Sequence, residues 1–138
     1  FTAGREYTFR LEAIDGNGVS TYTEIYLTSN GPPHSGTLVV TPSIGSALRT
    51  EFMLVAAGWS DDADDYPLYF TFKYSLTPRQ SSSTFVEYTI QSASESPYAA
   101  SRLSPGLEST NYTVYCTVRV ADFNDAAVTV DAPVISVL

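Results

Sequence analysis

The chain has 138 residues and a formal net charge of −8, with 43% apolar and 16% charged residues. This length and apolar content suffice for one domain with a sizeable core, or for one domain and part of another. Only seven residues are Lys or Arg, which argues against a nucleic-acid-binding surface. The single cysteine excludes an internal disulfide, and no apolar run reaches the roughly 18 residues of a membrane span. No signal-peptide pattern opens the chain, so we expect Phe1 to be internal to a longer precursor.

The first thirty residues predict a β-hairpin. EYTFRLEAID alternates apolar and polar residues, which is typical of a half-buried strand. DGNG at 15–18 favours a tight turn, and STYTEIYLTS supplies a second strand. NGPP then interrupts the pattern, because prolines cannot continue a strand ladder. We therefore predict that residues 1–30 are the last two strands of a preceding β-sandwich, followed by a linker at 31–33.

The remaining residues, 34–138, predict a complete β-sandwich of about seven strands, because turn signals separate short alternating segments at the spacing of that fold. TPRQSSS at 77–83 is an expected loop, and no segment carries a helical period of ten residues. The expected strands are GTLVVTP, TEFMLVAAGW, LYFTFKYS, TFVEYTI, YAASRL, NYTVYCTVRVAD and AVTVDAPVISVL. In the sixth, Tyr112 and Cys116 are predicted to point inward and Thr117 outward.

Two local patterns resemble known families of sandwich. Leu107, Thr110 and Tyr112 are similar to the tyrosine corner of fibronectin type III domains, in which a Tyr hydroxyl bonds to the upstream backbone. Tyr7 has the same relation to its own strand. Residues 30–74 resemble the receptor-for-egg-jelly (REJ) module of polycystins, sperm receptors and related protist surface proteins. The matching residues are Pro32, Pro33, Gly36, Pro42, Gly45, Thr50, Phe52, Gly58, Trp59, Asp61, Pro67, Leu68, Tyr69 and Phe72.

The REJ resemblance implies an all-β fold of tandem immunoglobulin-like or fibronectin type III-like sandwiches, the first only partly present here. It also implies a long modular extracellular protein with an adhesive or mechanical role, on the cell surface, with a cilium or flagellum as one candidate location. It implies no enzyme. The autoproteolytic site that follows such modules in some relatives requires a His–Leu–Ser/Thr type of sequence, which this chain lacks.

The acidic segment GWSDDADDYPLY holds the main candidate site residues. Asp61, Asp62, Asp64 and Asp65 can supply carboxylate oxygens to calcium, which takes six to eight oxygen ligands. The spacing is not that of an EF-hand, and aspartates are common in solvated turns, so we favour a structural bend and keep calcium as the alternative. Acid–base catalysis would need a cleft that shifts a carboxyl pKa. A weaker version has calcium shared between Asp15–Asn17 and this loop.

Three further residues each carry a structural and a chemical interpretation. Trp59 is expected to close one end of the core, with sugar stacking as the alternative. His34, the only histidine, is expected on a surface loop, because no second metal ligand or triad partner is nearby. Cys116 is expected to be a buried apolar filler, because a reactive thiol needs exposure and a cationic neighbour.

Asn111-Tyr112-Thr113 forms an N-glycosylation sequon at the start of a strand. Because Tyr112 is predicted to point inward, Asn111 is expected to be accessible, and we predict glycosylation if the protein is secreted. A chance triplet is the alternative.

We therefore predict a non-enzymatic structural or adhesive segment of a large extracellular protein. Its expected partners are neighbouring modules of the same chain or other surface proteins, joined through edge strands and the hairpin, in a tandem or filament-like assembly. No nucleic-acid partner is expected, and membrane attachment would come only through other parts of the parent protein. The alternative is a calcium-dependent adhesion or glycan-binding module, with ligands in 61–65 and with Trp59 or Tyr66 stacking on sugar. No cofactor is expected, with calcium as the alternative.

Overall fold

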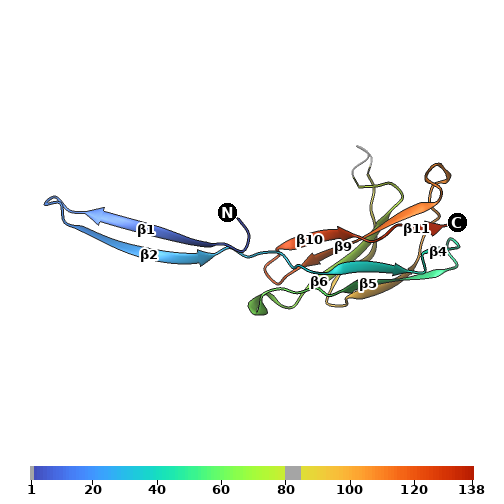
Figure 1. The fold of residues 1–138 in the computed structure, drawn as a ribbon, viewed down its shortest axis with the longest axis horizontal. Helices are drawn as coiled ribbons and strands as arrows, with labels where there is room; N and C mark the ends of the chain where they lie inside the picture. The colour runs from blue at the N-terminus through green and yellow to red at the C-terminus, as the bar shows by residue number, and fades with distance from the viewer. Residues whose placement is uncertain (1, 80–84) are drawn as a thin grey trace. The chain divides into compact units, whose positions relative to one another are not determined.

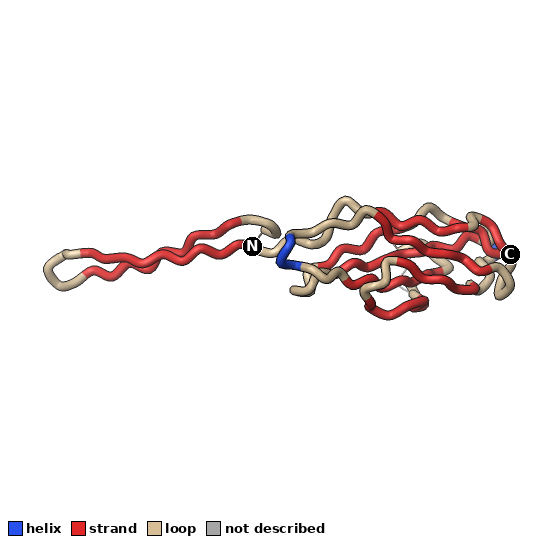
Figure 2. Tube along the Cα trace, turned by 90° about the horizontal axis from the view of Figure 1, so that it is seen from below, coloured by secondary structure: helices blue, strands red, loops and turns tan. Residues whose placement is uncertain are grey.

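The computed structural model describes residues 2–79 and 85–138, and its contacts divide the chain into two compact units, Phe1–Gly31 and Pro32–Leu138. Strands make up most of both units, as Figures 1 and 2 show. Helical structure among the described residues is limited to two 3-10 turns, η1 (Ala63–Asp65) and η2 (Glu108–Thr110). No helix in this part of the chain is long and apolar enough to cross a membrane. The all-β prediction is confirmed.

The first unit is a two-stranded antiparallel hairpin of β1 (Glu6–Ile14) and β2 (Ser20–Thr28). Residues directly opposite in such a pair lie on the same face, so the register groups the apolar side chains together. This apolar hairpin face consists of Tyr7, Phe9, Leu11, Ala13, Ile25 and Leu27. Most of it is open to solvent: the exposed fractions are 44% for Phe9, 71% for Leu11 and 57% for Ile25.

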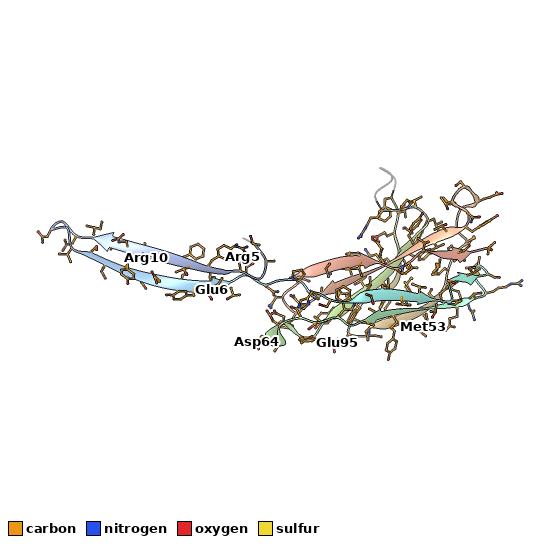
Figure 3. All side chains as sticks on the ribbon, viewed as in Figure 1. Arg5, Glu6, Arg10, Met53, Asp64 and Glu95 are labelled. Atoms are coloured by element: carbon orange, nitrogen blue, oxygen red, sulfur yellow. The ribbon has the colours of Figure 1, made fainter. Side chains whose placement is uncertain are left out.

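The opposite face of the hairpin is held by polar contacts. Arg10 forms an ion pair with Glu24 at 2.7 Å, and its guanidinium lies 4.3 Å from the ring centroid of Tyr22. The hydroxyl of Tyr26 donates to the other oxygen of Glu24 at 2.9 Å. Figure 3 labels Arg10 and Glu6 on this ribbon. The side chains of the hairpin therefore alternate as in a half-buried pair of strands. One face is polar and held by side-chain contacts, and the other is apolar and exposed to solvent.

The second unit has two sheets. One is three-stranded and antiparallel, in the order β3–β5–β8; the other runs β4–β11–β9–β6–β7, with β10 also paired to β9. All pairs in the second sheet are antiparallel except β4 with β11. The bounds are β3 (Thr37–Thr41), β4 (Ile44–Gly45), β5 (Glu51–Ala57), β6 (Tyr69–Ser75), β7 (Tyr88–Ser94), β8 (Tyr98–Arg102), β9 (Thr113–Ala121), β10 (Ala127–Asp131) and β11 (Ile135–Val137).

A single apolar core joins these two sheets. Strand β5 alternates strictly, and its Phe52, Leu54 and Ala56 are buried while the residues between them are exposed. From the other sheet, Phe72 and Val118 are fully buried against the same cluster. Side chains from the inner faces of two sheets thus meet in one layer, which is the arrangement of a β-sandwich.

The C-terminal end differs in detail from the predicted single strand. Residues 127–138 form β10 and β11, which pair with different parts of β9 and are separated by a break that contains Pro133. Proline has no N–H for the ladder, which accounts for the interruption. Thr117 was predicted to point outward, yet it is only 4% exposed, and it lies in a hollow that Pro78, Arg79 and residues of the break after β10 also line.

The units meet in sequence at the prolines, with Pro32 and Pro33 belonging to the second unit. Pro33 is buried, and His34 pairs with Ser60 through two backbone hydrogen bonds of 2.9 and 3.0 Å. Residues 80–83 of the predicted loop, and Thr84 of the following predicted strand, lie outside the described residues.

Candidate functional site

The acidic segment occupies the loop between β5 and β6, which contains the 3-10 turn η1. Its four carboxylates form two pairs that differ in solvent exposure. Asp62 and Asp64 are exposed, whereas Asp61 and Asp65 are half-buried. Figure 3 labels Asp64 where it projects from the end of this loop. The four aspartates singled out in the sequence therefore do not act as one set.

Asp61 and Asp65 instead meet a third carboxylate, that of Asp122. One oxygen from each of these three residues lies within 4.8 Å of the others. The topology brings them together: β6 and β9 are antiparallel neighbours with Tyr69 opposite Ala121, so the loop that enters β6 lies beside the turn that leaves β9. We call Asp61, Asp65 and Asp122 the acidic cluster. Asp122 is only 2% exposed.

Hydrogen bonds fix the geometry of the acidic cluster. Asp122 Oδ1 accepts the backbone N–H groups of Asn124 and Ala126, at 2.8 and 2.9 Å. Asn124 Nδ2 donates to Asp65 Oδ1 at 2.7 Å, and the Phe123 N–H donates to the Asp65 carbonyl at 2.9 Å. The two loops are thereby joined through both side chains and backbone.

Asp61 is the least satisfied member. Its Oδ1 accepts the Asp62 N–H at 2.9 Å, but its Oδ2 is buried and accepts no hydrogen bond from the described residues. Burial raises the pKa of the Asp61 carboxyl, the Asp62 N–H opposes that shift, and the charges of Asp122 and Asp65 add to it. Carboxylates that converge in this way repel one another unless a proton or a cation lies between them.

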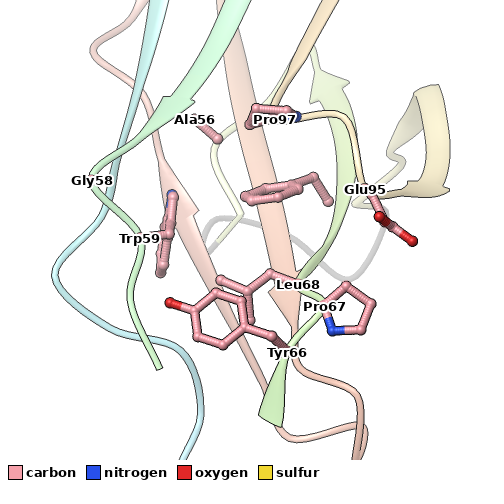
Figure 4. Close-up of a pocket in the computed structure, with 9 residues that line it drawn as sticks. Ala56, Gly58, Trp59, Tyr66, Pro67, Leu68, Glu95 and Pro97 are labelled. Atoms are coloured by element: carbon pink, nitrogen blue, oxygen red, sulfur yellow. The ribbon is translucent and has the colours of Figure 1, made fainter. Parts of the chain in front are cut away.

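A surface cavity of about 320 Å³ adjoins the same loop. Figure 4 shows Trp59, Tyr66 and Leu68 gathered on one side of it, with Pro97 opposite and the Glu95 carboxylate turned away from the rings. The indole of Trp59 is packed tightly on Gly36, where a Cβ would fall 2.1 Å from a ring carbon, and it also contacts the core. Trp59 Nε1 is buried without a hydrogen-bond partner among the described residues. The tryptophan thus closes part of the core and also lines a cavity.

The residues of the predicted tyrosine corner lie near the start of β9. Tyr112 has φ of 58°, in the left-handed region, and its N–H donates to the Leu107 carbonyl at 2.8 Å. A Cβ on Gly106 would fall 2.2 Å from the Tyr112 carbonyl, so this backbone approach requires glycine. Asn111 is exposed and also left-handed, at the end of η2.

In the hairpin unit, the Tyr7 hydroxyl accepts a hydrogen bond from the Thr2 backbone N–H, which holds the pKa of Tyr7 below its usual value. Asp15 lies in the turn, where its Oδ1 accepts the N–H groups of Asn17 and Val19 at 2.8 and 2.9 Å. That carboxylate oxygen stabilises the turn between β1 and β2. The chain leaves the hairpin at its other end, after β2.

His34 and Cys116 show different degrees of access. His34 is exposed, and its Nδ1 lies 2.7 Å from Ser35 Oγ. A nucleophile–base pair needs a third group that orients the base, and among residues 2–79 and 85–138 no carboxylate hydrogen-bonds to His34. Cys116 is 1% exposed, and burial raises the pKa of its thiol to about 12. The Cys116 side chain is therefore a protonated thiol that packs in the core as a small apolar group.

Asp122 is the residue that sequence reasoning missed. It follows directly on the alternating strand that ends at Ala121, and it opens the turn DFNDA. An aspartate at that place signals a turn, but its approach to Asp61 depends on strand order, which one sequence does not reveal.

Comparison with known proteins bears on the whole chain. No curated protein sequence matched it. The sequence model of the REJ domain matches residues 1–134, nearly the full length. This domain is not a known catalytic family, and it is typical of extracellular modules of polycystin-type proteins. The match extends the resemblance of residues 30–74 over both units, and the chain therefore belongs to the REJ domain family.

Proposed function

We propose that the chain is a structural and adhesive segment of a large modular surface protein, with no catalytic role. The observation that carries this proposal is the uncovered apolar hairpin face. Six apolar side chains lie on one side of two regular strands, and a two-stranded hairpin alone is only marginally stable in water. An apolar sheet face of this kind normally packs against a second sheet.

The occupant that we propose for this face is the opposing sheet of a second sandwich, formed by the module that precedes this chain in the parent protein. The alternation of side chains along the hairpin supports this occupant. In a sandwich the apolar face of a sheet is buried against the other sheet, whereas the polar face, here with the Arg10–Glu24 ion pair, stays in water. The parent protein would then be a tandem array of sandwiches at the cell surface, with a cilium or flagellum as one candidate location. Its contacts would be with neighbouring modules and other surface proteins.

Cysteine accessibility in the parent protein tests this proposal. Leu11→Cys lies on the apolar hairpin face and Glu12→Cys lies on the polar face one residue away. The native Cys116 is buried and gives little background. On intact cells, a membrane-impermeant maleimide is expected to label Glu12→Cys and to spare Leu11→Cys. Equal labelling at both positions would show that nothing covers the apolar face and would overturn the proposal.

A second candidate function is glycan binding at the cavity beside Trp59. It is favoured by one observation: the side chains of Trp59 and of the exposed Tyr66 both line the cavity. Aromatic side chains with an apolar body and a polar tip, such as tyrosine, are suited to contact with the ring of a sugar.

Trp59 is the only tryptophan, so its fluorescence reports on this cavity directly. Titration with neutral and acidic oligosaccharides is expected to give a saturable change that Tyr66→Ala removes and Tyr98→Ala, an exposed tyrosine on β8, retains. Unchanged emission throughout the panel would rule out this candidate.

A further inference from the structure

We propose that Asp61, Asp65 and Asp122 form a calcium site that joins the β5–β6 loop to the β9–β10 turn. This goes beyond the proposed structural function, which requires no metal and does not depend on the outcome. It also differs from the sequence-based alternative, because two of the four aspartates in 61–65 are excluded from the site and a residue from another loop is included.

The distances fit a single ion. Calcium binds oxygen at about 2.3–2.6 Å, so two ligand oxygens on opposite sides of one ion lie up to about 5 Å apart. One oxygen from each of the three carboxylates lies within 4.8 Å of the others. One ion can therefore contact all three carboxylates with at most a small adjustment of the side chains, and water or backbone carbonyl oxygens can complete the coordination.

A second observation, independent of the clustering, also points to a cation. Asp61 Oδ2 is buried and has no hydrogen-bond donor among the described residues, although Oδ1 of the same carboxylate is satisfied by a backbone N–H. A buried carboxylate oxygen is costly unless it is paired. Its nearest charged neighbours are other carboxylates, and none of the ion pairs of the described residues includes Asp61 or Asp65.

The surrounding structure positions the three carboxylates in advance. In each of them Oδ1 already accepts at least one N–H: from Asp62 for Asp61, from the Asn124 side chain for Asp65, and from two backbone groups for Asp122. These bonds hold the side chains against their mutual repulsion. An ion bound between them would replace repulsion between the two loops with attraction, and it would stabilise the folded state by an amount that grows with the logarithm of the ion concentration above the dissociation constant.

Calcium is favoured over magnesium because the ligands come from two irregular loops. Magnesium requires a near-ideal octahedron with short bonds and usually retains several waters, whereas calcium accepts irregular sets of oxygens. Extracellular modules with such sites bind calcium with dissociation constants of about 10⁻⁴–10⁻³ M. An extracellular location, typical of this family, supplies calcium in that range.

The test is thermal unfolding of the full 138-residue chain in calcium chloride, in magnesium chloride and in chelator, at constant ionic strength. At calcium concentrations about tenfold above the dissociation constant, the melting temperature is expected to rise by about 5 °C. Asp61→Asn is expected to abolish most of that rise. Asp62→Asn and Asp64→Asn remove the same charge from the same loop at exposed positions, and they are expected to retain it.

Asp122→Asn tests the partner loop. Since Asp122 is buried, that variant can fail to fold, and Asp65→Asn together with terbium luminescence sensitised by Trp59 and Tyr66 provides a separate measurement. A melting temperature that calcium leaves unchanged would overturn the proposal. So would a rise of equal size in Asp61→Asn and Asp62→Asn, which would indicate diffuse charge screening. An equal rise with magnesium would contradict the assignment to calcium.

Discussion

Replacing one phenylalanine in each unit separates the contributions of the two units. Phe72 in β6 is 0% exposed and lies in the core between both sheets, whereas Phe9 in β1 is 44% exposed on the hairpin. Truncation of a fully buried Phe costs about 3–5 kcal/mol, since the transfer free energy is lost and a cavity remains. Phe72→Ala is therefore expected to lower the melting temperature of the second unit by about 12–20 °C.

Phe9→Ala is expected to leave that transition unchanged. Phe9 lies opposite Ile25 in the hairpin register, and such cross-strand pairs contribute about 0.2–1 kcal/mol. The contacts of the chain place Phe9 in a separate compact unit, so its loss is expected to affect the hairpin alone.

The assay is thermal unfolding for the melting temperature and denaturant unfolding for the free energy, both followed by the fluorescence of Trp59, which lies in the second unit and is the only tryptophan. Circular dichroism of the same samples reports on both units. A loss of less than about 1 kcal/mol for Phe72→Ala would refute the core described here. A Trp59 transition shifted equally by Phe9→Ala would refute the division into two units.

Three further predictions concern single positions. Gly36→Ala is expected to cost about 1–3 kcal/mol and to shift the Trp59 emission maximum, because the new Cβ would overlap the indole ring; Gly16→Ala, where a Cβ meets no atom within 4 Å, is the control, and equal effects would contradict the packing. Cys116, with its pKa raised to about 12, carries a thiolate in about one molecule in ten thousand at about pH 8. Alkylation followed by mass spectrometry is expected to show modification only in denaturant, and rapid labelling of the native chain would contradict its burial. Asn111 is exposed, so secretion from a eukaryotic host is expected to add a glycan that Asn111→Gln and glycosidase both remove; an unchanged mass in the wild-type chain would contradict this.

Alternation in the sequence predicted the strands well, because a sandwich buries every second residue. Phe52, Leu54 and Ala56 were expected on one face, and all three are buried. The hairpin and the break at the prolines are visible for equally local reasons: turn residues tolerate positive φ, and proline ends a ladder. These features depend on neighbours in the sequence.

Features that depend on strand order were not predicted. The acidic cluster combines a loop before β6 with a turn after β9, and their proximity follows from the pairing of Tyr69 with Ala121. Similarly, Thr117 alternates as an outward residue, yet it is buried in a hollow that Arg79 and other residues distant in sequence also line. Tyr112 was expected as the first inward residue of its strand, but its left-handed backbone places it just before β9 begins.

Hydrogen exchange measured by mass spectrometry tests most directly whether the hairpin belongs to a neighbouring sandwich. The comparison is between residues 1–138 and a chain extended into the native upstream sequence. In the 138-residue chain, amides of residues 6–28 are expected to exchange rapidly and those of β5, β6 and β9 slowly, since an isolated hairpin opens readily. In the extended chain, amides of residues 6–28 are expected to become as well protected as those of β9. Rapid exchange of the hairpin in both chains would contradict the proposal that a preceding module covers its apolar face.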